Sequence, residues 1–388
     1  MPPEEAAAAR PNATDTASRV VVAMSGGVDS SVAAWLLAEE GLELVGLFMR
    51  NGVEVEAAEA AKKSCCSLTD ARDARMVSAR LGIPFQAVDL KAEFGSIIRY
   101  FVSEYTKGRT PNPCAVCNRD LKFDRLLRFA EELGADTVAT GHYARIAVVD
   151  GRVEVRRGVD RSKDQSYQLF SVAEANLART RLPLGGMQKD AVRALASKVG
   201  LRTAAKPDSQ EICFVPGNDY RRLLAEHGVE LHAGEFVDTR GRVLGRHTGT
   251  ENFTIGQRRG LGIALGEPMY VLDLVPETGT VVLGLAEECL YRAIETGPAN
   301  WIGIDAPGAE GLRAQVQVRY HHSAAPATVH VTETGTRVEF DEPQSAVAPG
   351  QGAAFYQGDR LVGGGWIERA ERVDTRSAEA ATRPSAPA

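Results

Sequence analysis

Ser25-Gly26-Gly27-Val28-Asp29-Ser30-Ser31 is the stretch that decides the fold of this 388-residue chain. An apolar, β-branched run precedes it at residues 20–24, and apolar residues recur four apart through residues 31–40 behind it. The stretch therefore predicts a strand, a glycine-rich turn and a helix. Two glycines let successive backbone N–H groups point toward one place beside the positive end of the helix. We expect an anion of pyrophosphate size there, the alternative being a plain glycine turn with a serine helix cap. The loop lacks the Lys of a Walker loop, which argues against a kinase-type grip on a γ-phosphate.

Strands and helices alternate behind this turn as far as about residue 220. The predicted strands are residues 42–49, 85–90 and 137–140, and the predicted helices are residues 70–81, 94–105 and 119–133. Asp150 and Gly151 predict the turn of a hairpin. Repeated β–α units with short turns imply a parallel sheet covered on both faces, so the fold class is α/β.

The helical periodicity largely ends near residue 220. Short alternating strands, such as residues 270–274 and 353–356, then follow one another with turns between them, a pattern typical of small β-barrels or sandwiches. Prolines 298 and 307 suggest a further division. We therefore expect an α/β domain over 19–220, a central β-rich domain over 221–296 and a C-terminal β-barrel domain over 297–372. The tails, 1–18 and 373–388, are rich in Ala, Ser, Thr and Pro and are predicted to be disordered.

The composition excludes few functions. The formal net charge is −6, which argues mildly against a basic nucleic-acid coat but leaves room for local basic patches. No stretch is apolar for long enough to span a bilayer, and the N-terminus lacks the basic flank of a secretory signal, so we expect a cytoplasmic protein. Six cysteines are too few for a disulfide scaffold, and their thiols should be reduced. Cys65, Cys66 and Cys289 are expected to pack as small apolar residues.

Further motifs follow the glycine-rich stretch in a fixed order. They are residues 110–118 (TPNPCAVCN), 139–145 (ATGHYAR), 163–167 (KDQSY), 207–214 (PDSQEICF), 253–262 (FTIGQRRGLG), 318–320 (VRY) and 349–351 (PGQ). The glycine-rich stretch alone resembles the PP-loop of ATP pyrophosphatases, which cleave ATP between the α and β phosphates. Together the motifs resemble the bacterial MnmA (TrmU) family over roughly residues 19–370. The resemblance implies a PP-loop domain of the adenine nucleotide alpha hydrolase type, followed by two small β-barrel-like domains, and 2-thiolation of the wobble uridine of certain tRNAs.

The resemblance also implies site residues. Cys117 matches the family's nucleophilic cysteine, and Cys213 matches the cysteine that carries incoming sulfur as a persulfide. Contacts with ATP are implied for Ala23, Met24, Ser25, Gly26, Gly27, Val28, Asp29, Ser30, Met49 and Gly141. Contacts with tRNA are implied for Asn112, Pro113 and Cys114, which would face the target base, and for His142, Lys163, Asp164, Gln165, Arg319, Tyr320 and Gln351. The implied cofactors are ATP and Mg²⁺, and the implied partners are tRNA and a protein that donates persulfide sulfur. We expect the free enzyme to be a monomer.

The implied chemistry is sound in itself. The C2 carbonyl of uracil is a poor electrophile because oxide is a very poor leaving group. Adenylation of its oxygen makes AMP the leaving group, and Mg²⁺ would offset the charge on the departing pyrophosphate. A persulfide can then supply sulfur, and a second thiolate can release that sulfur and leave a disulfide for a cellular reductant.

Cys114 departs from the family, which often has Asp at this position. Cys114, Cys117 and Cys213 together could hold a [4Fe–4S] cluster with one iron open to sulfide. The alternatives are a metal-free Cys-x-x-Cys redox pair and a buried small residue at position 114. Structural zinc is disfavoured because no second cysteine pair has the spacing of ligands.

Two rival functions also fit parts of the sequence. One is a PP-loop ligase or amidotransferase that acts on a small molecule, which would need neither Cys117 nor Cys213. The other is a tRNA-binding protein that holds nucleotide only as a structural ligand, for which Ser25 and Asp29 would be dispensable. Turnover that depends on RNA separates the thiolase from both.

Overall fold

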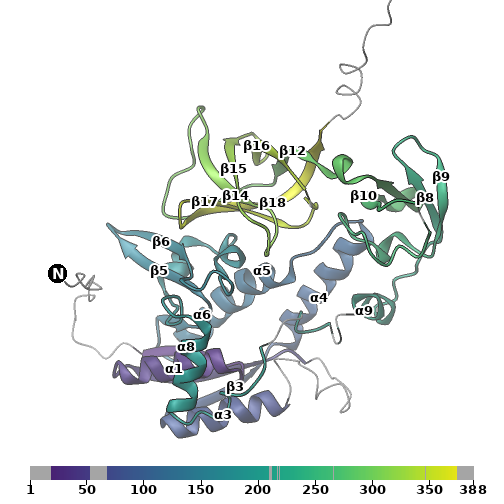
Figure 1. Ribbon diagram of the computed structural model, residues 1–388. Coiled ribbons are helices and arrows are strands. Elements are labelled where there is room, and N and C mark those ends of the chain that lie inside the picture. Colours follow the sequence, from purple (N-terminus) through teal and green to yellow (C-terminus); the bar gives the residue numbers. More distant parts are fainter. Residues whose placement is uncertain are drawn as a thin grey trace, which may run out of the picture.

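The computed structural model describes residues 19–52, 68–208, 212–215, 217, 219–264, 266–345 and 347–373. The predicted disordered tails, except for Val373, lie outside these residues, as do Cys65 and Cys66. The chain forms a parallel-sheet domain, a small four-stranded sheet and a closed barrel, which confirms the predicted α/β class (Figure 1). None of the helices in the described residues is both long and apolar enough to cross a bilayer.

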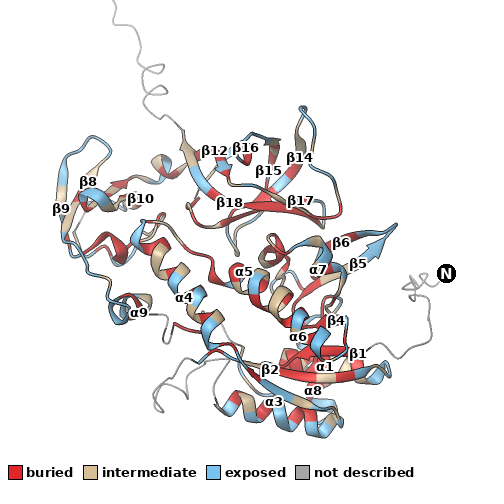
Figure 2. Cartoon of the chain, turned by 180° about the vertical axis from the view of Figure 1, so that it is seen from behind, coloured by how far each residue is buried: buried red, intermediate tan, exposed pale blue. Residues whose placement is uncertain are grey.

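The first domain is built on a five-stranded parallel sheet in the order β3-β2-β1-β4-β7. Its strands are β1 (Arg19–Ala23), β2 (Glu43–Arg50), β3 (Phe85–Asp89), β4 (Thr137–Ala139) and β7 (Thr180–Arg181). Val20 and Val22 of β1 belong to one apolar cluster and Val21 belongs to another, because neighbouring side chains on a strand point to opposite faces. Both faces of the sheet are therefore covered, as the alternating β–α pattern predicts (Figure 2).

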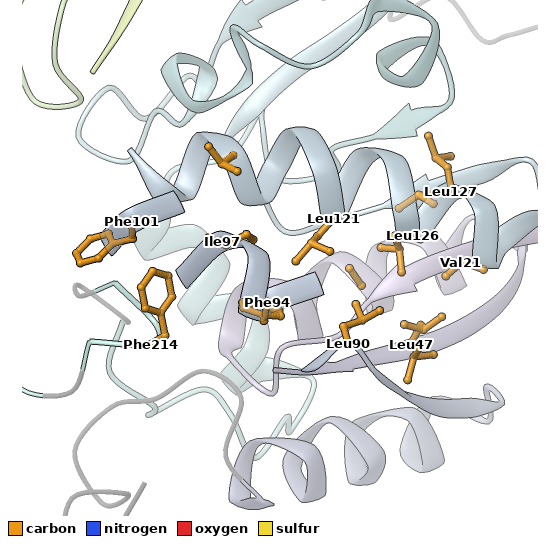
Figure 3. Close-up of a cluster of buried hydrophobic side chains, with 14 of the residues drawn as sticks. Val21, Leu47, Leu90, Phe94, Ile97, Phe101, Leu121, Leu126, Leu127 and Phe214 are labelled. Carbon is orange, nitrogen blue, oxygen red and sulfur yellow. The ribbon is translucent and has the colours of Figure 1, made fainter. Parts of the chain in front are cut away.

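Helices from different parts of the chain cover the two faces. The first face carries α1 (Val28–Glu39), α3 (Leu68–Leu81) and α8 (Lys189–Lys198), and the second carries α4 (Lys91–Thr106) and α6 (Leu126–Glu132). Figure 3 shows the apolar cluster between this second face and its helices, in which Phe101 of α4 lies next to Phe214. These two rings meet edge to face with their centroids 5.4 Å apart. The segment that bears Cys213 is therefore anchored on α4.

A continuous helical run covers residues 113–132. It consists of α5 (Pro113–Cys117), a π-helical segment η1 (Asn118–Arg125) and α6. The run begins six residues before the predicted start because Asn112 caps it: its side chain accepts a hydrogen bond of 3.2 Å from the Ala115 amide, and Pro113 occupies the first turn. Cys114 and Cys117 therefore lie on a helix and not in a loop. A widened π turn, which is often found at functional sites, follows Cys117 directly.

The central part of the chain contains one four-stranded sheet. Its strands are β8 (Gly234–Asp238), β9 (Val243–His247), β10 (Tyr270–Val275) and β11 (Thr280–Gly284), in the order β10-β11-β8-β9. The short helix α9 (Tyr220–Glu226) leads into it, and the Tyr220 ring stacks on Tyr105 of α4 at 4.5 Å between centroids. This stack attaches the central part to the first domain.

Six antiparallel strands close a barrel at the C-terminal end of the chain. They are β12 (Tyr291–Thr296), β14 (Leu312–Gln317), β15 (Ala325–Val331), β16 (Thr336–Gln344), β17 (Gly352–Gln357) and β18 (Arg360–Arg372), and β12 pairs with β18 to complete the ring. The short strand β13 (Asn300–Trp301) also pairs with β18. The barrel thus includes β12, although β12 precedes the proline-marked break.

The predicted hairpin of the first domain extends the barrel sheet. It consists of β5 (Ala144–Val149) and β6 (Arg152–Arg157), with Asp150 at a positive φ in the turn. Strand β6 pairs with β18 through Arg156 opposite Arg360 and Val155 opposite Leu361. The first domain and the barrel therefore share one hydrogen-bonded sheet.

Candidate functional site

The glycine-rich loop forms a turn at the carboxyl end of β1. Gly26 has φ +72°, and a Cβ there would lie 2.3 Å from the carbonyl oxygen of Asp70 at the start of α3, so only glycine fits. Ser30 and Ser31 donate from their hydroxyl groups to the Gly27 carbonyl at 3.3 and 2.7 Å. Helix α1 begins at Val28, three residues before the predicted start, and no described side chain caps it. Its first backbone N–H groups are therefore available for an anion.

Gly141 packs closely against the backbone of this turn. A Cβ on Gly141 would lie 2.8 Å from both the Asp29 carbonyl carbon and the Ser30 nitrogen, so a larger residue would displace the first turn of α1. Met49, also expected to contact ATP, is half-buried near the end of β2. The predicted ATP-contacting residues thus come from the loop, β2 and the end of β4, all at the carboxyl edge of the sheet, where open α/β sheets bind ligands.

A buried lysine holds the carboxylate of Asp29. Lys189 Nζ donates to both carboxylate oxygens at 2.7 and 2.8 Å, and the Tyr143 hydroxyl donates to Oδ1 at 2.7 Å. The Lys189 side chain is only 8 % exposed, so these carboxylates replace the water that its ammonium group has lost. Burial, together with the charge of Asp29, raises the pKa of Tyr143, so its hydroxyl stays protonated. Asp29 is therefore held in one orientation at the start of α1.

Asp208 joins this network. It pairs with Lys189 at 2.9 Å and with Lys163 at 2.8 Å, and it also contacts Arg193. Burial alone would raise its pKa, but the hydrogen bonds and charges of Lys163 and Lys189 prevail and lower the pKa to about 2. Asp29 and Asp208 supply two negative charges, whereas their three basic partners supply three positive charges. The carboxylate of Asp160, which accepts a hydrogen bond from the Lys189 amide at 2.9 Å, balances the third positive charge. The groups of the site that suit a polyphosphate are therefore the N–H groups of α1 and the ammonium group of Lys189.

Sequence reasoning missed Lys189, Asp208 and Tyr143 as members of the nucleotide site. Lys189 is the first residue of α8, a helix that was not predicted. A lysine in a sequence is normally expected to be exposed, so its burial could not be predicted. A third lysine, Lys206, lies on the other side of the loop and donates to the Gly26 carbonyl at 2.9 Å and to Asp73 at 3.0 Å. Lysines thus hold both sides of the turn.

The three candidate cysteines differ in their exposure. Cys114 is exposed, whereas Cys117 and Cys213 are half-buried and pack against the apolar cluster of Figure 3. The fold thus brings Cys117 and Cys213, 96 positions apart in the sequence, to the edge of one cluster. Within the described ranges, no group of three or more Cys, His, Asp or Glu side chains is arranged to hold a metal ion. The three cysteines therefore do not form a ready cluster site in this conformation.

The barrel fixes the segment expected to face the target base. Gln351 donates from its side-chain amide to the carbonyl groups of Thr110 and Pro111 at 3.1 and 2.9 Å, and the Thr110 amide donates to the Pro349 carbonyl at 2.8 Å. Asn112 is buried as the cap of α5. In this conformation Gln351 and Asn112 hold the backbone that presents Cys114.

His142 and Asp164, which are also expected to contact tRNA, have enclosed side chains, as Asn112 and Pro113 have. His142 is 8 % exposed, its Nδ1 lies 2.6 Å from the Thr140 hydroxyl, and burial, aided by the charge of Lys122, holds its pKa well below the ordinary value. The imidazole is thus neutral. The Asp164 side chain is 6 % exposed and bonds to Arg157 and to the Gly158 amide. In this structure the His142 ring packs against Phe123, whereas Asp164 holds Arg157 of β6, which also bonds to Gln317 of the barrel.

The other expected tRNA contacts are more accessible. Arg319 is exposed, Tyr320 is half-buried and Lys163 is one-third exposed, while Gln165 accepts a hydrogen bond from the Tyr143 amide at 3.1 Å. Burial and the charges of Asp164 and Cys114 raise the pKa of Tyr320 to about 12.

Asp164→Ala is expected to lower the free energy of unfolding by about 2–4 kcal/mol, because it removes an enclosed carboxylate and leaves the half-buried guanidinium of Arg157 without its ion-pair partner. The matched control is Asp359→Ala, which removes a carboxylate that is 45 % exposed and pairs with Arg161; its loss should cost less than about 1 kcal/mol. Urea unfolding followed by fluorescence would measure both changes. Equal losses of unfolding free energy in the two variants would contradict a structural role for the Asp164–Arg157 pair.

Comparisons with known proteins match all three parts of the chain. A family model described as "tRNA methyl transferase HUP domain" matches residues 18–217. Models described as "tRNA methyl transferase PRC-barrel domain" and "Aminomethyltransferase beta-barrel domain" match residues 221–285 and 291–367. These limits agree with the α/β domain, the four-stranded sheet and the barrel.

Curated relatives match over nearly their whole length. The protein of Carboxydothermus hydrogenoformans is 49% identical over 357 residues, which cover 90% of this chain and 98% of the relative. The protein of Geobacter metallireducens is 50% identical over 360 residues (91% and 97%), and that of Solibacter usitatus is 48% identical over 367 residues (90% and 99%). Each of the three is named "tRNA-specific 2-thiouridylase MnmA". The family models mention methyl transfer, whereas the full-length relatives are named for thiolation.

Proposed function

This chain belongs to the family of tRNA-specific 2-thiouridylases, and we propose that it adenylates the C2 oxygen of the wobble uridine in tRNA and then replaces that oxygen with sulfur. AMP and pyrophosphate are the other products. The observation that carries the proposal is the site around Asp29, where the uncapped N–H groups of α1 adjoin an ion-paired network of lysines and carboxylates. Such a site suits the pyrophosphate of ATP.

Residues of the loop and of α8 would bind the phosphates of ATP. Lys189 can move from the carboxylates to the phosphate oxygens, while the first turn of α1 donates its N–H groups. Both carboxylate oxygens of Asp29 point to one place, which the ammonium group of Lys189 occupies in this structure. When Lys189 moves to the phosphates, a divalent cation could take that place. When bound, Mg²⁺ would offset the charge on pyrophosphate.

In the proposed sulfur step only thiols take part. Among the described side chains, no group of three is arranged to bind an iron–sulfur cluster. Cys213 carries the incoming sulfur as a persulfide. The Cys117 thiolate attacks the inner sulfur, a Cys117–Cys213 disulfide forms, and hydrosulfide leaves. The hydrosulfide attacks C2 of the adenylated uridine, and AMP leaves with the oxygen. Both cysteines border the same apolar cluster.

We propose the following partners on the same basis. Arg319 and Lys163, both accessible, would contact the tRNA backbone, where a few basic residues outweigh an acidic total charge. A persulfide-bearing protein would supply the sulfur, and the enzyme would act as a monomer. A thiol-based cycle suits the reducing cytoplasm.

Nucleoside mass spectrometry tests the proposed function. Unmodified tRNA, ATP, Mg²⁺ and chelator-treated enzyme charged with persulfide should yield 2-thiouridine under anaerobic conditions, and no 2-thiouridine should form without ATP. Rescue that requires added iron and sulfide would instead support the cluster route. No product under either condition would contradict the proposed function.

A further inference from the structure

The proposed reaction leaves a disulfide that is poorly placed for reduction. Both Cys117 and Cys213 are half-buried against an apolar cluster, so a disulfide between them presents little surface to a reductant in solution. Thiol–disulfide exchange requires a thiolate to reach one of the sulfur atoms. Each turnover thus ends in a state that the enzyme must resolve before Cys213 can accept sulfur again.

An exposed thiol lies beside this disulfide. Cys114 and Cys117 are three residues apart on α5, and residues at this spacing on a helix are neighbours, with Cβ atoms about 5–6 Å apart. A disulfide needs a Cβ separation of about 3.5–4.5 Å, so a local movement of about 1–2 Å suffices. The regular α-helical pattern ends at Cys117, where the π-helical segment begins. The helix is therefore least regular where the movement is needed.

The surroundings of Cys114 also favour exchange. Cys114 is exposed, whereas its two partners are half-buried. The capping of α5 by Asn112 and the Gln351 contacts hold the backbone around Cys114 in place.

We propose that Cys114 is the resolving thiol of the catalytic cycle, a role that rests on the proposed function. The Cys114 thiolate attacks the Cys117 sulfur, the Cys114–Cys117 bond forms, the Cys117–Cys213 bond breaks, and Cys213 leaves as a thiolate. This exchange moves no net electrons. A cellular dithiol or small thiol then reduces the exposed Cys114–Cys117 disulfide and supplies two electrons and two protons. Cys213 is free to accept the next persulfide during this reduction.

A single-turnover experiment tests the proposal. Chelator-treated enzyme carrying one persulfide reacts with tRNA, ATP and Mg²⁺ without reductant, and an alkylating agent then traps the remaining thiols for peptide mass spectrometry. The wild type is expected to hold a Cys114–Cys117 disulfide and an alkylated Cys213. Cys114→Ser is expected to hold one Cys117–Cys213 disulfide for each 2-thiouridine that it forms. With continuous persulfide and a thiol reductant, its turnover should fall by on the order of tenfold.

The outcomes separate the role of Cys114 from the function itself. A wild type that holds only the Cys117–Cys213 disulfide overturns the proposal, and so does a Cys114→Ser enzyme that forms 2-thiouridine without retaining that disulfide. If the wild type forms no 2-thiouridine, the proposed function fails, not merely the resolving role. Cys289→Ala removes a buried thiol outside the site and should match the wild type in both assays.

Discussion

Cys213→Ser is expected to lower the rate of 2-thiouridine formation by more than about 10³-fold, because serine cannot carry a persulfide and the loss of a covalent-catalysis residue has effects of this size. Serine is close to cysteine in volume, and Cys213 is only half-buried, so the fold should survive. Adenylation precedes sulfur transfer, so tRNA-dependent release of pyrophosphate should continue. Parallel assays of 2-thiouridine and pyrophosphate would separate the two steps.

The pyrophosphate assay makes this result specific. Thiolation by Cys213→Ser at the wild-type rate would contradict the assignment of Cys213 as sulfur carrier. Loss of both products would place Cys213 before sulfur transfer, which also contradicts that assignment. Cys117→Ser should behave like Cys213→Ser, since the proposed release of sulfide needs both thiols.

Gly26→Ala is expected to lower kcat/KM for ATP by at least about 100-fold, the effect of displacing a binding group by about 1 Å. The added Cβ would lie 2.3 Å from a backbone oxygen of α3, and backbone cannot swing away as a side chain can. The loop must move instead, and its N–H groups no longer point at the phosphates. Pyrophosphate release as a function of ATP concentration measures the change.

Gly41→Ala is the matched control for Gly26→Ala. Gly41 follows α1 with φ +76°, and no atom lies within 4 Å of an added Cβ. Both substitutions place alanine in the left-handed region at a cost of about 1–2 kcal/mol, but only Gly26→Ala also meets the backbone of α3. Gly41→Ala should therefore lose stability and keep its affinity for ATP. Equal losses of ATP turnover would mean that backbone strain alone explains the effect.

Local patterns in the sequence were enough to predict the nucleotide loop. The apolar strand, the paired glycines and the apolar spacing of α1 all lie within residues 20–40, so no distant contact is needed to see them. The resemblance to a family supplied Cys117 and Cys213, and the structure places both at one cluster. Their assigned roles stay predictions until the assays above are made.

Long-range packing explains what the sequence did not predict. Strand β18 contains Gly363, Gly364 and Gly365, a run that resembles a loop, yet a Cβ on Gly364 would lie 2.8 Å from Phe170 and one on Gly365 would lie 2.5 Å from Thr296. The glycines are thus required by neighbours far away in the sequence. The same holds for Lys189, whose partner Asp29 is 160 positions away. The burial of His142 likewise depends on packing against Phe123.

The pairing of β6 with β18 has a consequence for synthesis on the ribosome. Arg360 leaves the ribosome about 200 residues after β6, which at about 5–20 residues per second is a delay of about 10–40 s. During that time the unpaired edge of β6 exposes backbone N–H and C=O groups that could pair with a strand of another chain. Arg152, Glu154 and Arg156 alternate along this strand with buried valines, and charged edges of this kind discourage mispairing. We therefore expect the hairpin's charges to protect the nascent chain until its own C-terminal strand arrives.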